Sequence, residues 1–316
     1  MANQKSNNAN SESNRSLNVV FVLDTTTSMK TYFAGTNVMI LDKMNEVVEN
    51  FLKQIMENTK FFEITKVAFI TFSDGVTMDT DFYKVKDLKQ ECFKPLSDKY
   101  VQKVTMKKDV YVKIPGGKSD TIEVPVFEDI GKPTYSRVGA GVLHALNKLD
   151  KENQRMKKEF DAQGKSGERP YVPVMVLISD GAPNRTVDGK SCPTAFPPEE
   201  EEAKKQVREY CTSTGDATKL VIPVICAIGD EEVREQLEGY ADYSSGYEAG
   251  FQYINPSNPG SGFEDLIVTL GQSLTRSISL AEEAKKKKDA LESEGKKKDG
   301  VKQEKYRPYG PVMDQF

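Results

Sequence analysis

The fold is decided by the stretch Leu17-Asn-Val-Val-Phe-Val-Leu-Asp24-Thr-Thr-Thr-Ser-Met29. Its apolar run from Val19 to Leu23 is short, rich in β-branched and aromatic side chains, and free of alternating polar residues. This pattern is typical of a strand that is buried on both faces of a sheet. Oxygen-bearing side chains then follow at alternate positions, at Asp24, Thr26 and Ser28. In a tight turn after a strand, such oxygens can converge on one point, as a hard divalent cation requires.

Further apolar runs predict an alternation of strands and helices along the rest of the chain. Helical spacing extends from roughly Asn37 to Glu57, and residues 66–72 form a second buried run. The later strands are expected at residues 171–178 and 220–228, and the later helices from Val138 to about Lys157, from Pro198, from Glu231 and from Phe263 to about Ser279. We therefore expect an α/β fold with a doubly wound, mostly parallel sheet and helices on both faces.

An insertion at about residues 78–128 interrupts this alternation. Two alternating apolar runs, 111–114 and 121–126, flank the Gly-rich turn at 115–118. Such runs predict a β-hairpin, which lies outside the main sheet or extends its edge. The insertion belongs to a predicted domain that covers residues 17–280.

The two ends of the chain differ from this domain in composition. Residues 1–16 are rich in Asn and Ser, and we expect a disordered arm there. Residues 281–316 begin as a lysine-rich charged helix and continue as a linker and tail. The aromatic, proline-containing segment 306–316 is either a docking peptide that orders on a partner or a disordered end.

A second carboxylate is expected at the same edge of the sheet as Asp24. Asp180 follows the apolar run 171–178 directly, and the carboxyl ends of parallel strands share one edge. Asp24 contributes one charge, and the hydroxyls of Thr26 and Ser28 contribute none. This set suits an oxygen-preferring divalent ion better than zinc. The alternative is that Asp24 and Asp180 only cap the turns and helices that follow them.

The segment Asp24-Thr-Thr26-Thr-Ser28 resembles the DxSxS motif of von Willebrand factor type A (VWA) domains, with Thr in the middle position. The family pattern adds a threonine from a later loop, which Thr134 matches in Gly-Lys-Pro-Thr. It also adds an aspartate from an (I/V)(S/T)DG segment, which Asp180 matches in Leu-Ile-Ser-Asp-Gly. The resemblance covers roughly residues 17–279 and fails over the insertion.

The resemblance implies a metal-ion-dependent adhesion site (MIDAS). Its direct ligands would be Ser28, Thr26 and Thr134, and Asp24 and Asp180 would bind the ion through water or directly. Mg²⁺ is the first choice, with Mn²⁺ or Ca²⁺ as substitutes. An ion held mainly by neutral hydroxyls keeps much of its charge, so it can accept a carboxylate from an Asp or Glu of a partner protein.

The expected function is a metal-ion-dependent protein-binding module, an adaptor or subunit of an intracellular multiprotein assembly. The alternative is a regulatory subunit of an ATPase, a chelatase or a kinase/phosphatase stress-response system like that of tellurite resistance, or a metal-dependent hydrolase. No catalytic constellation is evident, so we expect a protein that is not an enzyme. A haloacid-dehalogenase-type phosphatase needs a second aspartate two residues after Asp24, where this chain has Thr26. The single histidine, His144, is expected to be a packed or solvated helical residue.

Composition restricts the setting in which the protein works. Lys and Arg number 44 against 48 Asp and Glu, giving a formal net charge of −4, which is too balanced to indicate nucleic-acid binding. The four cysteines form no CxxC pair, which favours a reducing compartment over disulfides or zinc. No apolar stretch reaches the length of a membrane span, and the N-terminus lacks the pattern of a signal peptide. We expect a cytoplasmic protein.

Overall fold

The structure is a computed structural model in full atomic detail. It describes residues 15–73, 75–87, 111–114, 122–125, 136–165, 170–181, 185–187, 190–192, 198–211, 220–241 and 250–295. The predicted N-terminal arm, apart from residues 15 and 16, and the tail at 306–316 lie outside these residues, as does Thr134.

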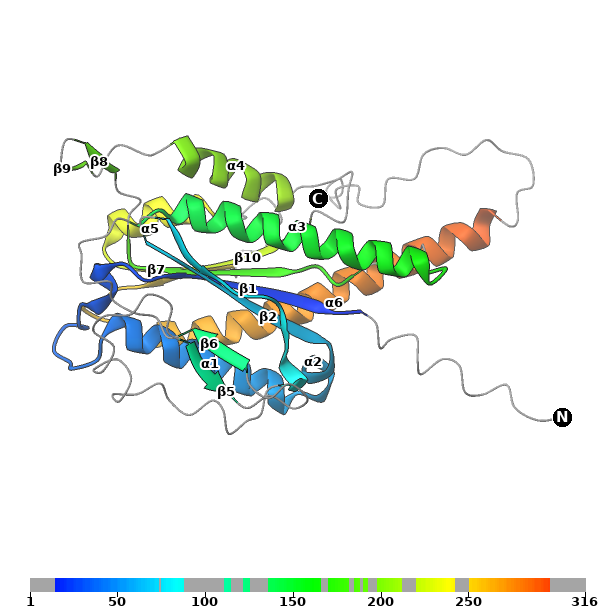
Figure 1. The fold of residues 1–316 in the computed structure, drawn as a ribbon, viewed down its shortest axis with the longest axis horizontal. Helices are drawn as coiled ribbons and strands as arrows, with labels where there is room; N and C mark the ends of the chain where they lie inside the picture. The colour runs from blue at the N-terminus through cyan, green and yellow to red at the C-terminus, as the bar shows by residue number, and fades with distance from the viewer. Residues whose placement is uncertain are drawn as a thin grey trace, which may run out of the picture.

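The central sheet is built mainly from parallel strands in the order β11-β10-β7-β1-β2-β3, with β1 near its middle (Figure 1). Adjacent strands β1, β2, β7, β10 and β11 all pair in parallel. Their bounds are β1 Leu17–Asp24, β2 Thr65–Phe72, β7 Val174–Ser179, β10 Ile222–Ile228 and β11 Phe251–Ile254. Read from β2 to β11, the parallel strands lie in the order β2-β1-β7-β10-β11. In order of appearance along the chain this is 2-1-3-4-5, which defines a doubly wound sheet.

Antiparallel strands complete one edge and form two small separate sheets. Strands β3 (Val76–Asp79) and β4 (Tyr83–Lys84) both pair with β2 in the antiparallel sense. The predicted hairpin is present as a sheet of its own, in which β5 (Tyr111–Ile114) pairs with β6 (Ile122–Pro125). A second small hairpin joins β8 (Arg185–Val187) to β9 (Lys190–Cys192).

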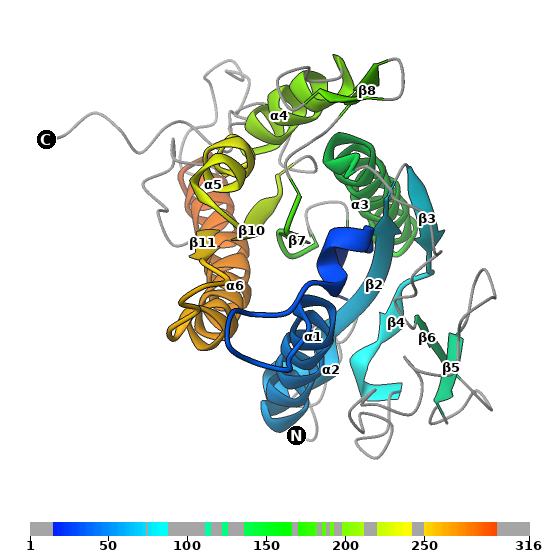
Figure 2. The same ribbon diagram turned by 90° about the vertical axis from the view of Figure 1, so that its left-hand side faces the viewer.

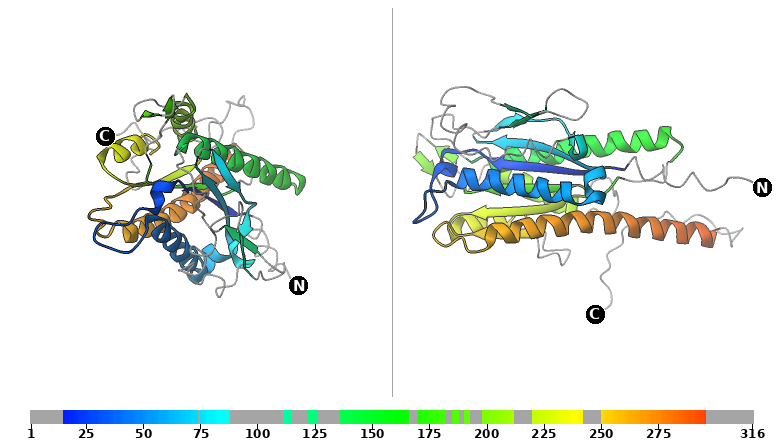
Figure 3. Two further views of the ribbon diagram at one scale, coloured as in Figure 1. Left: turned by 60° about the vertical axis from the view of Figure 1, so that its left-hand side comes forward. Right: turned by 90° about the horizontal axis from the view of Figure 1, so that it is seen from below.

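Helices cover both faces of the sheet (Figures 1 and 3). One apolar cluster joins the sheet to α1 and α6, and a second cluster joins its other face to α3, α4 and α5. The bounds are α1 Ile40–Glu57, α2 Thr59–Ile64, α3 Val138–Ala162, α4 Pro198–Cys211, α5 Glu231–Glu238 and α6 Gly262–Gly295, with 3₁₀ turns η2 at Thr27–Lys30 and η3 at Val85–Asp87. None of the helices in the described ranges is long and apolar enough to cross a membrane.

Strand β1 is the centre of the core because helix layers cover both of its faces. All eight of its residues are buried. On one face Phe21 stacks on Phe69 at 5.4 Å between ring centroids and meets Phe51 of α1 edge-on at 5.7 Å. On the other face α3 approaches closely at Gly141, where an added Cβ would lie 2.8 Å from the ring of Phe72 and 3.0 Å from Val22. The apolar run in the sequence is therefore continuous because neither face of β1 meets water.

The predicted fold class is confirmed, and the differences from the sequence-based expectations are local. The expected helix from Asn37 begins only at Ile40, because Val38 lies in a loop. Strands β3, β4 and β11 were not expected; each is four residues or shorter and lies at or beside an edge of the sheet. The strand expected from residue 171 begins at Val174, directly after Pro173.

Candidate functional site

The candidate site lies at the carboxyl end of β1 and β7, the point where the strand order of the sheet reverses (Figure 2). From β1 the chain proceeds to β2 on one side, and β7 lies on the other side. Asp24 is the last residue of β1, and Asp180 comes directly after the end of β7. In open α/β sheets this reversal point opens a crevice at the carboxyl ends of the strands, where ligands bind.

Asp24 is the buried centre of the site. Its side chain has no exposed surface, and it accepts three hydrogen bonds. Oδ1 accepts from the backbone N–H of Thr26 at 2.9 Å, and Oδ2 accepts from the hydroxyls of Ser179 at 2.6 Å and Ser136 at 3.0 Å. These donors come from three separate segments of the chain, so Asp24 joins the β1 loop, the start of α3 and the end of β7.

A chain of oxygen atoms leads from this centre to the surface. Thr26 Oγ1 lies 2.9 Å from Ser28 Oγ, and Ser28 Oγ donates to Asp180 Oδ1 at 2.8 Å. Thr26 is buried, whereas Ser28 is exposed and Asp180 is half-buried. The site therefore has an inner carboxylate that solvent does not reach and an outer edge that a ligand can reach.

The two carboxylates are in an unfavourable electrostatic environment. Burial raises the pKa of Asp24 above its ordinary value of 3.8, and the hydroxyls of Ser179, Thr26 and Ser136 oppose this rise. The pKa of Asp180 is raised well above 3.8, first by burial and then by the negative charge of Asp24, while the Ser28 hydroxyl lowers it. Two neighbouring acids whose pKa values are both raised in this way favour either a proton or a metal cation between them.

The donor set is compatible with an oxygen-coordinated divalent ion. An octahedral Mg²⁺ shell at about 2.0–2.1 Å places adjacent ligand oxygens about 2.8–3.0 Å apart. The Thr26–Ser28 and Ser28–Asp180 oxygen pairs have this spacing. Because ordinary hydrogen bonds have the same length, the stronger argument is the chemistry: the acids and hydroxyls are hard oxygen ligands. In the described ranges no group of three or more His, Cys, Asp or Glu is placed to hold a metal, and the candidate set combines two acids with hydroxyls.

Gly181 makes the close packing of the site possible. A Cβ atom at this position would lie 1.9 Å from Ser136 Oγ, 2.5 Å from Ser136 Cβ and 3.3 Å from Asp24 Oδ2. Its N–H also donates to Ser179 Oγ at 3.1 Å, which holds that hydroxyl toward Asp24. The Ser-Asp-Gly order after β7 therefore supplies a donor, an acid and the space that the neighbouring segment needs.

Ser136 lies two residues before α3, and the first turn of α3 is held in place by α4 and by the residues that follow α5. Glu200 is fully buried in α4 and accepts a hydrogen bond from the N–H of Gly139 at 2.8 Å. The buried hydroxyl of Tyr240 donates to the other oxygen of Glu200. On the surface, Arg137 forms a two-pronged ion pair with Glu199, with Nε 2.6 Å from Oε1. Burial is the main cause of the raised pKa of Glu200, and its two donors lower it again.

The structure brings together four of the five residues that the sequence predicts for the site: Asp24, Thr26, Ser28 and Asp180. Thr134 lies outside the described residues, so its position and its role as a ligand remain a prediction. Sequence reasoning missed Ser136 and Ser179, which both donate to Asp24. Both lie within two residues of a predicted ligand, and that proximity is the signal that points to them.

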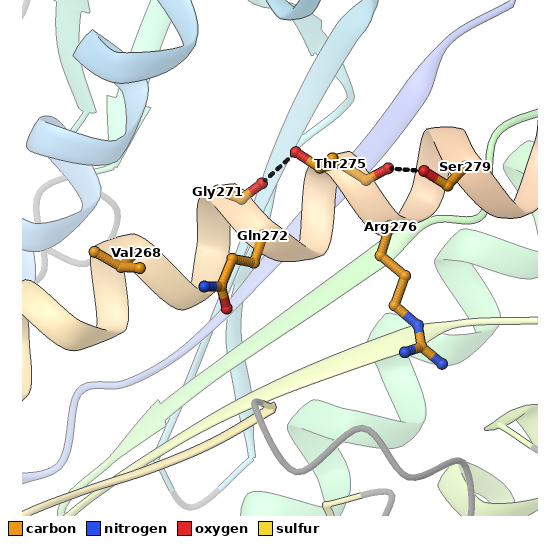
Figure 4. A pocket seen from close by; sticks show the side chains of 6 residues that line it. All are labelled: Val268, Gly271, Gln272, Thr275, Arg276 and Ser279. Atoms are coloured by element: carbon orange, nitrogen blue, oxygen red, sulfur yellow. Dashed lines mark hydrogen bonds between the residues drawn. The ribbon is translucent and has the colours of Figure 1, made fainter.

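Two other groups of polar side chains differ in chemistry from the site at Asp24. The single histidine, His144, contacts Asp79 Oδ2 at 2.8 Å, and Lys148 binds the other oxygen of Asp79 at 2.8 Å. This group joins α3 to β3 on a partly exposed surface. A shallow groove on α6 is lined by Val268, Gly271, Gln272, Thr275, Arg276 and Ser279 (Figure 4). Thr275 and Ser279 each donate to a backbone oxygen four residues earlier, so these hydroxyls bond within the helix.

The protein is thus a doubly wound α/β domain with a cluster of acids and hydroxyls at its switch point. No protein-family model matches the chain, and no curated protein matches it in sequence. Among solved structures, it is similar to the von Willebrand factor domain of the type V pili tip protein Mfa5 from Porphyromonas gingivalis, with 13% identity and a TM-score of 0.48. That match covers 82% of this chain and 96% of the Mfa5 domain.

Two further solved structures have similar folds. The PilB minor pilin from Streptococcus sanguinis is 12% identical with a TM-score of 0.46; the match covers 83% of this chain but only 61% of PilB. The conserved hypothetical protein BatB from Bacteroides thetaiotaomicron is 11% identical with a TM-score of 0.40, over 82% of this chain and 99% of BatB. These likenesses concern the fold alone.

Proposed function

We propose that the protein is a metal-ion-dependent protein-binding module. Asp24, Thr26, Ser28 and Asp180, together with Thr134 as the sequence motif predicts, would hold one divalent ion, with Mg²⁺ as the first choice. A bound Mg²⁺ would supply positive charge and a coordination position for a carboxylate of a partner protein. We further propose that the protein serves as an adaptor or subunit of an intracellular multiprotein assembly.

One observation carries this proposal: Ser28 Oγ lies 2.8 Å from Asp180 Oδ1, although the two residues are 152 positions apart. Only the parallel pairing of β1 and β7 brings their loops to one place. Asp24 does cap the turn after β1 through the N–H of Thr26, but capping does not explain the bonds that the two acids make to distant segments. Asp24 binds hydroxyls from distant segments, and Asp180 binds a hydroxyl of the β1 loop.

Each residue of the site has a distinct task in this proposal. The exposed Ser28 hydroxyl and the Thr26 hydroxyl offer neutral oxygens, so they bind a cation without cancelling its charge. Asp180 stands at the outer edge, where it binds directly or through water. Asp24 is fully buried and satisfied by three donors, so it orients the hydroxyls and supplies charge from below.

The direct test is thermal unfolding of the full chain with EDTA and with increasing Mg²⁺, Mn²⁺ or Ca²⁺. An ion that binds only the folded state at about 100 times its Kd stabilises it by about 2.7 kcal/mol. Ser28→Ala is expected to lose most of this stabilisation, whereas Thr275→Ala, which removes an exposed hydroxyl on α6, retains it. Stabilisation of wild type and Ser28→Ala to the same extent would contradict the proposed site.

Carboxylate binding is tested with the peptide Ac-Gly-Ser-Ser-Asp-Ser-Ser-Gly-amide and its Asn counterpart, in Mg²⁺ and in EDTA. We expect the Asp peptide to bind only in Mg²⁺ and the Asn peptide to bind in neither condition. A ligand-observed NMR titration reaches the millimolar Kd values expected for so short a segment. Equal binding of the Asp and Asn peptides would contradict the role of the partner carboxylate.

The stabilisation by Mg²⁺ is expected to grow with pH. Both acids have a folded-state pKa raised above 3.8, so the metal-free protein gains stability from their protonated forms. That gain is fully present below pH 3.8 and is lost as pH rises through the raised folded-state pKa values. Metal binding needs the ionised forms, so the difference in Tm between Mg²⁺ and EDTA increases over the same window. A difference that falls or stays constant as pH rises through this window would refute the assignment.

A further inference from the structure

Three exposed apolar side chains lie at the same end of the sheet as the candidate site. In the described part of the chain, the large hydrophobic residues classed as exposed are Tyr32 at 58%, Val38 at 43%, Val76 at 37% and Val268 at 56%. Val268 lies on the outer face of α6 (Figure 4). The other three lie on loops or strand ends at the same end of the sheet as Asp24. Exposed apolar surface that borders polar groups is a feature of protein interaction sites.

Tyr32 and Val38 belong to one firmly built loop, residues 31–39, that starts beside the site. The N–H of Thr31 donates to the carbonyl of Ser28 at 2.9 Å, and Tyr32 forms a β-bridge with Met39. The side chain of Thr36 bonds both the carbonyl of Phe33 and the N–H of Val38. The turn passes through Gly35, whose φ of +74° favours glycine.

The loop is also anchored to the body of the protein. Phe33 is buried and packs edge-on against Phe263 of α6, with 5.5 Å between ring centroids. The N–H of Ala34 donates to the carbonyl of Pro256 at 3.0 Å. Tyr32 is therefore exposed to solvent, although the next residue, Phe33, packs in the core. An aromatic side chain held out by a well-ordered loop loses little conformational entropy when a partner covers it.

Val76 lies on the opposite side of the site, at the edge of the sheet. It is the first residue of β3 and pairs with Phe72, which itself pairs with Asp24 across β2 and β1. Two strand spacings of about 4.8 Å place its backbone about 10 Å from that of Asp24. The carbonyl of Ser73, in the loop between β2 and β3, accepts from the N–H of Arg137, so this edge also contacts the segment that carries Ser136.

From this arrangement we propose that the site recognises an extended segment of a partner protein in which the carboxylate is flanked by apolar side chains. This inference rests on the proposed function, because the cation would provide the central attachment point. Residues two apart on an extended chain lie on the same face, about 6.6–6.8 Å apart. Apolar residues two positions before and after the acid would then reach toward Tyr32 and Val38 on one side and Val76 on the other. A purely polar acidic segment would leave these side chains in water.

The test compares two peptides that differ only in the flanking residues. Ac-Gly-Phe-Ser-Asp-Ser-Phe-Gly-amide is titrated against the full chain in Mg²⁺ beside Ac-Gly-Ser-Ser-Asp-Ser-Ser-Gly-amide. Wild type is expected to bind the Phe peptide about tenfold more tightly. The double variant Tyr32→Ser/Val38→Ser is expected to lose most of this preference while its Mg²⁺ affinity, measured by thermal shift, stays unchanged. Val268→Ser, an exposed apolar residue on α6, is the matched control and keeps the preference.

The outcomes separate this inference from the proposed function. Equal affinities of wild type for the two peptides, or a preference that survives in Tyr32→Ser/Val38→Ser, overturns the apolar surface and leaves the metal site standing. Loss of Mg²⁺ affinity in the double variant also overturns it, because the loop would then act on the metal site. Binding that depends on neither Mg²⁺ nor the aspartate of the peptide overturns the proposed function itself.

Discussion

Asp180→Asn is expected to abolish the stabilisation by Mg²⁺ while making the metal-free protein more stable at neutral pH. The substitution removes a half-buried charge whose pKa is raised by burial and by the neighbouring Asp24. Without metal, this relieves repulsion between two acids, so the free energy of unfolding increases. With metal, the same change removes one anionic ligand, so a stabilisation of about 2.7 kcal/mol at about 100 times the wild-type Kd falls close to zero.

The opposite signs of these two effects make the experiment decisive. Thermal unfolding in EDTA and in saturating Mg²⁺ measures both effects in one series. Asp161→Asn is the matched control, because it makes the same acid-to-amide change at an exposed position near the other end of α3. A variant Asp180→Asn that is less stable than wild type in EDTA would mean that Asp180 serves as a structural hydrogen-bond acceptor. A variant that keeps the full Mg²⁺ effect would remove Asp180 from the site.

Gly181→Ala is expected to destabilise the protein by about 1–3 kcal/mol and to weaken metal binding. The added methyl would overlap Ser136, whose Oγ lies 1.9 Å and whose Cβ lies 2.5 Å from its position. Ser136 has little room to retreat, because it is buried and donates to Asp24. The β7 loop and the start of α3 must therefore separate, which disturbs Asp24 and Asp180 together. Chemical denaturation measures the loss of stability, and Mg²⁺ titration measures the loss of affinity.

A second variant identifies the cause of that loss. Gly181→Ala combined with Ser136→Gly removes the two Ser136 atoms that the new methyl would overlap, and leaves Asp24 Oδ2 at 3.3 Å as its nearest neighbour. The double variant is expected to regain most of the stability, apart from about 1 kcal/mol for the hydrogen bond that Ser136 gave to Asp24. Additive losses from the two single changes would show that the residues do not interact, contrary to the distances in the structure.

The centre of this fold was predictable because β1 is buried on both faces, so its residues had to be apolar without interruption. The acids at the ends of β1 and β7 then followed from parallel pairing. The edges were harder to predict. Strands β3 and β11 have four residues each, and their side chains are largely exposed or half-buried, so the sequence carries no run of apolar residues there.

Val38 shows why the predicted start of α1, at about Asn37, was wrong. Its apolar side chain fits the helical spacing of the residues that follow, yet its N–H bonds to Thr36 and its side chain is exposed. Spacing records which residues are apolar, but it does not distinguish a core contact from an exposed residue. Ser136 and Ser179 were missed for a related reason. A serine has no distinctive spacing, and only the three-dimensional approach of their segments to Asp24 reveals their role.

The buried contact of Glu200 with Gly139 and Tyr240 has a consequence for the order in which the protein assembles. The segment that bears Ser136 is fixed by residues that are synthesised about 60 to 100 positions later. During synthesis from the N-terminus, Asp24 and Ser28 therefore emerge long before their surroundings can be completed. Because closing long loops is entropically unfavourable, we expect contacts this distant along the chain to form late in folding. Under the proposed function, uptake of a cation would therefore mark a polypeptide that has finished folding, and partially folded chains would not bind partners.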